Sequence, residues 1–381
     1  MDSQERLRAW LILLQAPGVG GGALGALIER DIDPATLPGR SLSELGELGL
    51  GDAAARALRR PDEQRLATSL AWLDDPAHHL VTLDDDLYPP LLRTTGDAPA
   101  ALFVNGDAEA LLAPQVAVVG SRKATRGGLD TAAEFAAALA ATGLVVTSGL
   151  AVGVDGRAHR AALDAGGRTI AVAGTGPDRV YPAHHRDLAH QIVDNGAVVT
   201  PFAPGVGPRP GHFPARNRII SGMSLGVVVI EAGLRSGSLI TARLAGEQGR
   251  EVFAVPGSIR NPQARGCHRL IRDGARLVET PADVIEDLAP LAGELAGRLR
   301  AMLDEESAPA DEPVADDDPE VRAVLEALGF DPTPVEVVID RTELTTSAVS
   351  SILLTLELDG RVAAHAGGRY SRTGTNTERN S

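Results

Sequence analysis

Cysteine, aromatic residues and long apolar runs are all scarce in this chain of 381 residues. The single cysteine, Cys267, cannot form an internal disulfide, and no paired Cys/His spacing indicates structural zinc, so we expect a reducing compartment. No apolar run reaches the length of a membrane span, and the N-terminus lacks a basic segment followed by an apolar one. We therefore expect a cytoplasmic protein with no membrane partner.

Aromatic residues make up 3% of the chain, which argues against binding led by stacking on aromatic side chains. The net charge of -15 argues at first against a nucleic-acid partner as well. That average conceals a split, because residues 116–280 hold 19 Lys and Arg against 12 Asp and Glu, while the rest holds 17 against 39. Only the charge of this central segment favours an anionic ligand. The alternative explanation of its charge is an arginine-rich composition that forms no binding site.

The length of the chain predicts two or three domains. Residues 1–75 read as short helices of a small domain, in which residues 16–20 resemble a helix-hairpin-helix turn or form a plain interhelical turn. Residues 80–290 then alternate strand, glycine turn and helix, which predicts an α/β fold: an extended Rossmann-like, doubly wound parallel sheet. In such sheets ligands bind beyond the carboxyl ends of the strands.

The C-terminal part of the chain changes composition. Residues 291–318 are rich in Ala, Pro, Asp and Glu and predict a solvated linker. Residues 319–372 read as three helices and a hairpin, with Thr345 capping the third helix, which predicts a winged-helix domain. Contact with DNA and contact with a protein both remain open for this domain. We expect the tail, residues 373–381, to be disordered.

The first glycine turn of the central segment follows the strand 116–119. Gly120 permits close backbone approach there, and Ser121, Arg122 and Lys123 arrive where a phosphate would sit. A tight turn with solvated cations is the alternative. The segment is neither a dinucleotide fingerprint nor a Walker motif, so we expect no cofactor.

Two further glycine turns follow the next strands. Gly149 belongs to a second turn with backbone donors, after which Asp155 and His159 lie four residues apart, a spacing that suits a helix cap or internal hydrogen bond better than acid/base work. Arg168 begins the following strand, so it reaches phosphate only if the binding path passes a loop or strand edge there. Gly174 ends that strand.

The segment 210–243 has the layout of an anion site. Arg216 and Arg218 precede a buried strand at 227–230, and a hydroxyl-rich glycine turn follows it and opens a helix at about Leu239. Residues 234–243 contain no Asp or Glu, and Glu231 precedes the turn. This loop is expected to bind phosphate without cleaving it.

The order of these motifs resembles the DNA-processing protein A family, single-strand DNA binders that load recombinase during natural transformation. The resemblance covers roughly residues 80–290 and rests on Gly120-Ser121-Arg122, Ser148-Gly149-Leu150-Ala151, Tyr181-Pro182, Phe213-Pro214-Ala215-Arg216-Asn217-Arg218-Ile219-Ile220, Glu231-Ala232, Ser236-Gly237-Ser238-Leu239-Ile240-Thr241-Ala242 and Val255-Pro256-Gly257. It implies an extended Rossmann fold, a homodimer, binding of single-stranded DNA, no catalysis, and handover to a RecA-type recombinase.

The resemblance also implies which residues contact DNA. Arg122 and Arg168 are expected to be the main ligands, within the set Gly120, Ser121, Arg122, Lys123, Gly149, Arg168, Arg216, Arg218, Ser236, Gly237 and Ser238. The apolar positions Leu270, Ile271 and Leu277 are the candidate dimer face. Phe213 is a candidate for base stacking or for packing beneath the arginine loop.

Two other functions remain open at this point. One is a nucleotide phosphoribohydrolase of the lysine-decarboxylase-like Rossmann class, which needs a carboxylate in the second loop to assist cleavage of the sugar bond. The other is a sensor of small nucleotides, which predicts saturation by a mononucleotide.

Overall fold

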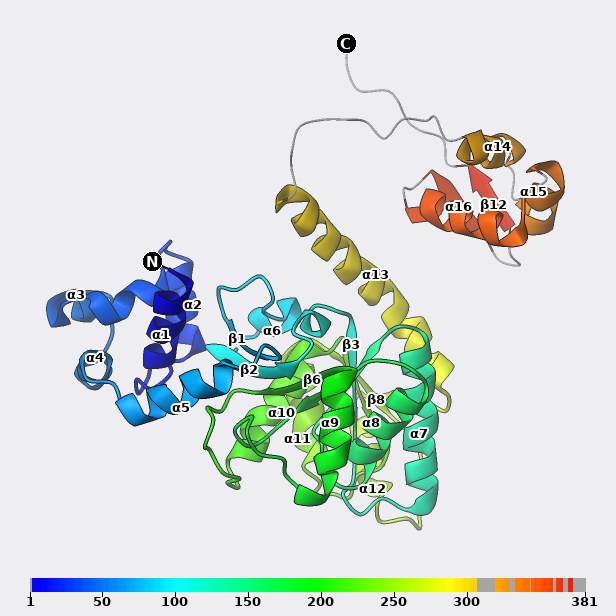
Figure 1. Ribbon diagram of the computed structural model, residues 1–381. Helices are drawn as coiled ribbons and strands as arrows, with labels where there is room; N and C mark the ends of the chain where they lie inside the picture. Colours follow the sequence, from blue (N-terminus) through cyan, green and yellow to red (C-terminus); the bar gives the residue numbers. More distant parts are fainter. Residues whose placement is uncertain are drawn as a thin grey trace. The chain divides into compact units, whose positions relative to one another are not determined.

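The computed structural model describes residues 2–306, 319–328, 333–342, 344–358, 361–365 and 369–372. The chain divides into two compact units, Met1–Asp304 and Glu305–Ser381 (Figure 1). Each unit has its own hydrophobic core. No helix among the described residues is both long and apolar enough to cross a membrane.

Short helices form the N-terminal part of the first unit (Figure 1). They are α1 Ser3–Leu13, α2 Gly21–Ile28, the 3-10 helix Pro34–Gly39, α3 Leu42–Glu47, α4 Asp52–Arg59 and α5 Glu63–Leu73. Asp2 and Ser41 each close a capping box, and Asp62 caps α5, which satisfies backbone N–H groups at the helix starts. Trp10 and Leu24 are fully buried in the core that these helices share with the sheet.

The turn between α1 and α2 contacts the main body of the unit. A Cβ on Gly21 would overlap the carbonyl group of Ala98, so a side chain there would push the helix away. Gly18 has φ +77 and an open surrounding, so it serves the turn itself. The resemblance of residues 16–20 to a helix-hairpin-helix is thus explained by an interhelical turn that docks on the loop before β2.

The described residues of the first unit form one large sheet with the strand order β1-β2-β6-β5-β4-β3-β7-β8-β9. Strands β3 to β9 pair in parallel, and β2 joins β6 and β1 in antiparallel fashion. The bounds are β1 His78–Thr82, β2 Ala101–Gly106, β3 Gln115–Val119, β4 Val145–Ser148, β5 Thr169–Val172, β6 Gly196–Thr200, β7 Gly226–Val229, β8 Glu251–Ala254 and β9 Arg276–Leu277.

Helices cover both faces of this sheet (Figure 1). Alternate residues of β3 separate the two cores, because Val116 and Val118 pack on one side while Ala117 and Val119 pack on the other. Helices α7 and α8 lie on the first side, and α10 and α11 on the second. The helices are α6 Pro90–Arg93, α7 Arg126–Ala141, α8 Val154–Asp164, α9 Arg186–Asp194, α10 His212–Met223, α11 Ser238–Glu247, α12 Arg265–Arg272 and α13 Pro281–Glu306.

The expected doubly wound α/β fold is therefore confirmed. The parallel order runs outward from β3 to β6 in one direction and from β7 to β9 in the other. The chain thus reverses its direction of sheet growth between β3 and β7, and this reversal opens a crevice at the carboxyl ends of those two strands.

The second unit has the helix-helix-helix-hairpin order of a winged helix. It contains α14 Pro319–Ala327, β10 Thr333–Pro334, α15 Val335–Thr342, α16 Thr346–Leu358, β11 Val362–His365 and β12 Arg369–Arg372. Val324, Val338 and Leu353 pack in its core. The Thr345 hydroxyl accepts the backbone N–H of Ala348 at 3.2 Å, so this residue caps the third helix as predicted.

The linker expected from residue 291 begins later. Helix α13 continues to Glu306, and Leu288 and Leu295 pack against the core of the first unit. Residues 291–306 are rich in Ala, Leu and Glu, whose helix propensity and apolar spacing outweigh the negative charge. The remainder of the expected linker, 307–318, and the expected disordered tail, 373–381, lie outside the described residues.

Candidate nucleic-acid interface

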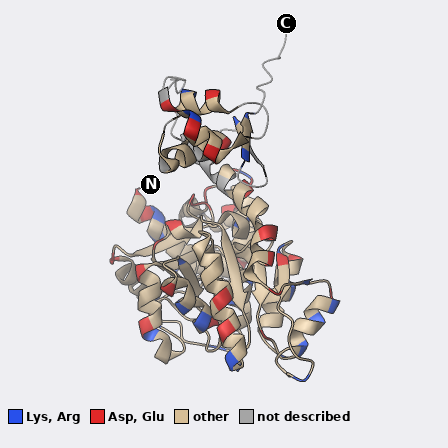
Figure 2. Cartoon of the chain, turned by 90° about the vertical axis from the view of Figure 1, so that its right-hand side faces the viewer, with Lys and Arg blue, Asp and Glu red and all other residues tan. Residues whose placement is uncertain are grey.

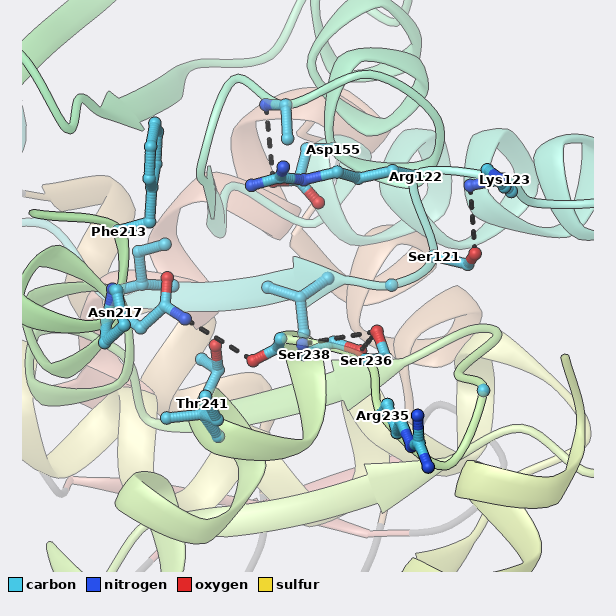
Figure 3. A pocket seen from close by; sticks show the side chains of 18 of the residues that line it. Ser121, Arg122, Lys123, Asp155, Phe213, Asn217, Arg235, Ser236, Ser238 and Thr241 are labelled. Carbon is cyan, nitrogen blue, oxygen red and sulfur yellow. Dashed lines mark hydrogen bonds between the residues drawn. The ribbon is translucent and has the colours of Figure 1, made fainter. Parts of the chain in front are cut away.

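A cavity of about 510 Å³ lies at the carboxyl ends of β3 and β7, where the sheet order reverses. Figure 3 shows its two walls, the loop after β3 with Ser121, Arg122 and Lys123, and the loop after β7 with Arg235, Ser236 and Ser238. Helix α10 contributes Phe213 and Asn217. The site therefore joins segments that are far apart in the sequence at the position where open α/β sheets bind ligands.

The loop after β3 is held from below by its neighbours. The backbone N–H of Ser121 donates to the carbonyl of Glu231 at 2.7 Å, and the Ser121 hydroxyl accepts the N–H of Lys123 at 3.0 Å. A Cβ on Gly120 would lie 2.6 Å from Cγ2 of Val154, so only glycine allows this approach. The loop is thereby fixed with its two cations, Arg122 and Lys123, exposed.

The second glycine loop supports the first one. Gly153 has φ +85, and a Cβ there would overlap the carbonyl of Ser121, so the residue must be glycine on both conformational and steric grounds. The N–H of Val154, at the start of α8, donates to that same carbonyl at 3.3 Å. The two glycine turns are thus nested, and a distortion of one is transmitted to the other.

Arg216 is buried beneath the cavity, with 4% of its surface exposed. Its Nη1 donates to the carbonyl of Val172 at 2.6 Å, and its guanidinium lies so close to Gly149 that a Cβ there would overlap it. Burial lowers the pKa of this guanidinium to about 10, while the nearby Asp155 carboxylate opposes the shift. Arg216 therefore ties the Gly149 loop to the end of β5, and it reaches the cavity as one side of its lining.

Asp155 and His159 do not pair with each other. The Asp155 carboxylate accepts the N–H of Ala151 at 3.4 Å, and burial raises its pKa while Arg216 lowers it. The Thr169 hydroxyl donates to the carbonyl of Val146, so it accepts Nδ1–H of His159 at 2.7 Å. Both side chains hold the fold, which is the structural interpretation favoured from the sequence.

The loop after β7 presents hydroxyl groups at the start of α11. The hydroxyls of Ser236 and Ser238 lie 2.7 Å apart, and Ser238 is the first residue of the helix, following Gly237. A Cβ on Gly237 would meet no heavy atom within 4 Å, so its surroundings are open. The N-terminus of a helix carries partial positive charge, which adds to these donors for an anion.

Three cations around the cavity form no salt bridge within the part of the chain that the structure describes, although the buried Asp155 interacts electrostatically with one of them, Arg122. Among the described residues, no carboxylate lies within salt-bridge distance of Arg122, Lys123 or Arg235. Elsewhere on the first unit, Arg is interspersed with Asp and Glu (Figure 2). Part of the basic excess of residues 116–280 is therefore concentrated at this cavity.

Two aromatic rings extend the cavity on one side. Tyr181 and Phe213 have ring centroids 5.6 Å apart, and the Arg122 guanidinium lies 5.5 Å from the centre of the Phe213 ring. They line an adjoining hollow of about 170 Å³ that also reaches Gly149. Tyr181 is 49% exposed, so it is accessible to a flat ring such as a base.

The structure places two predicted DNA ligands away from the cavity. Arg168 lies at the amino end of β5, at the opposite edge of the sheet, 3.6 Å from Asp107. Arg218 faces Asp97 at 3.5 Å. Arg216 and Arg218 differ in direction because residues two apart on a helix lie on different sides.

Glu231 is a buried carboxylate at the end of β7 that lines a different, small cavity. It accepts the N–H and the hydroxyl of Thr125, each at 2.8 Å, and the amide of Asn261 at 2.9 Å. Thr125 in turn caps α7. The carboxylate thus supports the start of α7 and the first glycine turn.

Sequence reasoning missed Asn217 and Gln263 as members of the cavity lining. Asn217 donates to the carbonyl of Gly237 at 3.4 Å and thereby links α10 to the serine loop. Its position between Arg216 and Arg218 in the motif was a usable signal. Gln263 lies far along the chain and carried no such signal.

The candidate dimer face is partly occupied within the unit. Leu270 and Ile271 are half-buried against the core, whereas Leu277 on the edge strand β9 is 47% exposed. Leu234 and Leu239 line a groove of about 1000 Å³ together with Leu270. An apolar surface is present there, and its use in a dimer remains a proposal.

Comparison with known proteins gives the relationships of the chain. Residues 79–289 match the family described as DNA recombination-mediator protein A, and residues 308–368 match the DprA winged helix domain. Protein Smf of Escherichia coli is 45% identical over 318 residues, which cover 83% of each chain.

Two solved structures are similar as well. DNA processing protein A from Streptococcus pneumoniae superposes with a TM-score of 0.62 at 36% identity, covering 74% of this chain and 95% of that one. DNA processing protein A from Helicobacter pylori, described for its single-stranded DNA binding mode, has a TM-score of 0.51 at 29% identity, covering 56% and 96%. The chain belongs to the DNA recombination-mediator protein A family of DNA-processing proteins.

Proposed function

We propose that this protein binds single-stranded DNA through its phosphates in the cavity between β3 and β7 and hands it to a RecA-type recombinase without cutting it. The observation that carries the proposal is the group of Arg122, Lys123 and Arg235, which line the cavity and form no salt bridge among the described residues. Unpaired cations beside serine hydroxyls and a helix start form a site for phosphate.

The geometry favours a single strand over a duplex. The cavity is a concave site between two loops, and the hollow beside it exposes the rings of Tyr181 and Phe213. Only unpaired bases can be splayed from a strand to stack on such rings. Since the other contacts are to phosphate, we expect sequence-tolerant and strongly salt-dependent binding.

The comparisons support the nature of the ligand and the role. The Helicobacter pylori relative is described by its single-stranded DNA binding mode, and the matched family by recombination mediation. A recombination mediator has to deliver a strand to a recombinase, so handover to a RecA-type partner follows as a proposal. We propose in addition a cytoplasmic homodimer that forms through the apolar surface near Leu277, with domains at 1–75, 80–290 and 319–372.

The position of Glu231 argues against the phosphoribohydrolase alternative. Its carboxylate is already engaged by Thr125 and Asn261 and lines another cavity. Asp155 does line the site, yet it is buried and accepts a backbone N–H. Neither carboxylate is placed as an exposed general base beside a sugar. Release of free base from a nucleoside monophosphate would revive the hydrolase.

Fluorescence anisotropy with labelled oligothymidylate tests the proposal. We expect preference for single strand over duplex and weak competition by mononucleotide, whereas a nucleotide sensor would be saturated by the mononucleotide. The Arg122→Ala variant should lose affinity at least about tenfold, because it removes a charge-assisted contact. Arg30→Ala, which removes an exposed arginine of the N-terminal helices, is the matched control. Unchanged affinity in Arg122→Ala would overturn the site assignment.

A further inference from the structure

A second cavity, of about 370 Å³, lies between the N-terminal helices and α9. The end of α5 and the start of β1 contribute Trp72 and His78, and α9 contributes Arg186 and His190. The loop before α9 closes it with Arg179. An aromatic surface and several basic side chains thus share one hollow outside the site already described.

The aromatic surface is rigid. The rings of Trp72 and His78 stack with centroids 3.9 Å apart and an interplanar angle of 7°, and Nδ1 of His78 donates to the carbonyl of Trp72 at 2.7 Å. The ring of Phe103 meets Trp72 edge-on at 5.9 Å. The edge of Phe103 and the hydrogen bond to the Trp72 carbonyl hold the stacked rings in place. Such a fixed stack offers a flat ligand a preformed surface, so little entropy is lost when the ligand binds.

The charge in this cavity favours an anion. Arg186 is exposed and has no carboxylate within salt-bridge distance among the residues that the structure describes. The carboxylate of Asp178 also lines the cavity, but it pairs with Arg179 at 3.2 Å and accepts the N–H of Gly205 at 2.8 Å. The negative charge is thus neutralised, and Arg186 and His190 remain available to a phosphate.

The wall between this cavity and the DNA site is thin. Gly149 and Ala151 line the hollow beside the main site, whereas Leu150 between them, at φ +56, lines the second cavity. In the same way Tyr181 faces the main site, and Val180 faces the second cavity. The two cavities are therefore neighbours along both segments, which is the condition for one strand to occupy both.

We propose that this cavity is a second nucleotide subsite, which takes a base against the Trp72–His78 stack and a phosphate at Arg186. The inference rests on the proposed function, because the nucleotide belongs to the same single strand that occupies the main site. A free nucleotide presents the same chemistry, so the test has to separate the two sources. The subsite would lengthen the proposed DNA-binding site and bring the N-terminal helices into contact with the DNA.

The fluorescence of Trp72 reports on this subsite directly. The chain has two tryptophans, and Trp10 is 1% exposed, so a Trp10→Phe protein leaves Trp72 as the only tryptophan, whose emission is excited selectively over that of the tyrosines. Oligothymidylates of about 4 and about 16 nucleotides compare a ligand confined to the main site with one that spans both. The long oligonucleotide should quench Trp72 with the same dissociation constant that anisotropy gives, and the short one should not.

Arg186→Gln supplies the second measurement, with Arg30→Gln as its control. It should abolish the quenching and lower the slope of log affinity against log salt by about 0.7 for the long oligonucleotide, the value for one phosphate of a single strand. The short oligonucleotide should bind unchanged. Arg122→Ala, in contrast, should weaken both.

Each other outcome is decisive. If the long oligonucleotide binds while Trp72 stays unquenched and Arg186→Gln keeps the salt slope, the subsite is wrong and the proposed function stands. If neither oligonucleotide binds, both proposals fall. A third outcome is saturable quenching of Trp72 by thymidine monophosphate, with the quenching lost in Arg186→Gln. That result would support the pocket as a nucleotide site but would overturn the proposal that the strand in the main site occupies it.

Discussion

The contact between Gly149 and Arg216 gives the sharpest prediction for the stability of the site. Gly149→Ala adds one methyl group where the guanidinium of Arg216 lies, so the two would overlap unless the arginine moves. The backbone of Gly149 is outside the left-handed region, so alanine is acceptable there on conformational grounds. Any loss of stability must therefore come from displacement of the buried arginine.

The magnitude follows from what the displacement breaks. Overpacking of a closed interior costs about 1–3 kcal/mol. Arg216 would also lose its 2.6 Å hydrogen bond to Val172, and a bond to a charged group contributes about 1.5–3 kcal/mol. We expect Gly149→Ala to lower the free energy of unfolding by about 3–5 kcal/mol. Gly246→Ala in α11, where no heavy atom lies within 4 Å, should instead stabilise the protein by about 0.5–1 kcal/mol.

Urea unfolding followed by circular dichroism measures both variants, and a double-mutant cycle isolates the contact. In an Arg216→Ala background the guanidinium is gone, so Gly149→Ala should cost less than about 1 kcal/mol. An equal cost in both backgrounds would refute the steric argument. So would a Gly149→Ala protein that unfolds at the same urea concentration as the wild type.

Two further predictions concern His159 and Arg168. Burial lowers the pKa of His159 to about 3 from 6.5, so only the unfolded state takes up this proton between those values. Stability should therefore fall as pH drops from 6.5 toward 3, by about 1.4 kcal/mol per pH unit for this group. In urea titrations His159→Gln should show that much less pH dependence in the window, and an unchanged slope would contradict the assignment. Arg168→Ala should keep its affinity for oligothymidylate within about twofold in anisotropy, because an exposed pair with Asp107 holds this arginine at the far edge of the sheet. A loss like that of Arg122→Ala would show that DNA reaches that edge.

The sheet could be predicted because buried parallel strands are short apolar runs between glycine turns. The strand expected at 116–119 is observed as Gln115–Val119. The loop after β3 and the loop after β7 with Ser236 and Ser238 were also identified. Small, hydroxyl and basic residues directly after an apolar strand are typical of a phosphate-binding turn. What joins them in space is the strand order, and no local pattern states that β7 lies beside β3.

The start of α10 shows where the local pattern failed. The sequence placed Arg216 and Arg218 only as residues before a buried strand, yet both lie within α10, which already begins at His212 and includes Pro214. Proline is tolerated in the first turn of a helix, where its missing N–H would have no partner in any case. This earlier start sets the directions of Arg216 and Arg218, so the expectation that both face DNA could not be tested from their spacing alone.

Arg168 lies away from the cavity for a related reason. The resemblance pairs it with Arg122 as a ligand, but it begins β5, whereas the cavity lies at the carboxyl ends of the strands. A residue at the amino end of a parallel strand is separated from such a site by the length of the sheet. Helix α13 likewise followed helix propensity across a stretch whose charge had indicated a linker.

The adjacency of β3 and β7 governs when the protein becomes able to bind. β4, β5 and β6 lie between β3 and β7 in the sequence although β7 is adjacent to β3 in the sheet, and such non-local pairing is slow because loop closure precedes any gain from contacts. A chain emerging from the ribosome carries Gly120 and Arg122 long before Ser238 exists. Such a chain contains the loop after β3 but not yet the loop after β7, which forms the opposite wall of the cavity. If the cavity is the binding site, a chain that has not yet reached α11 lacks Ser238 of its second wall.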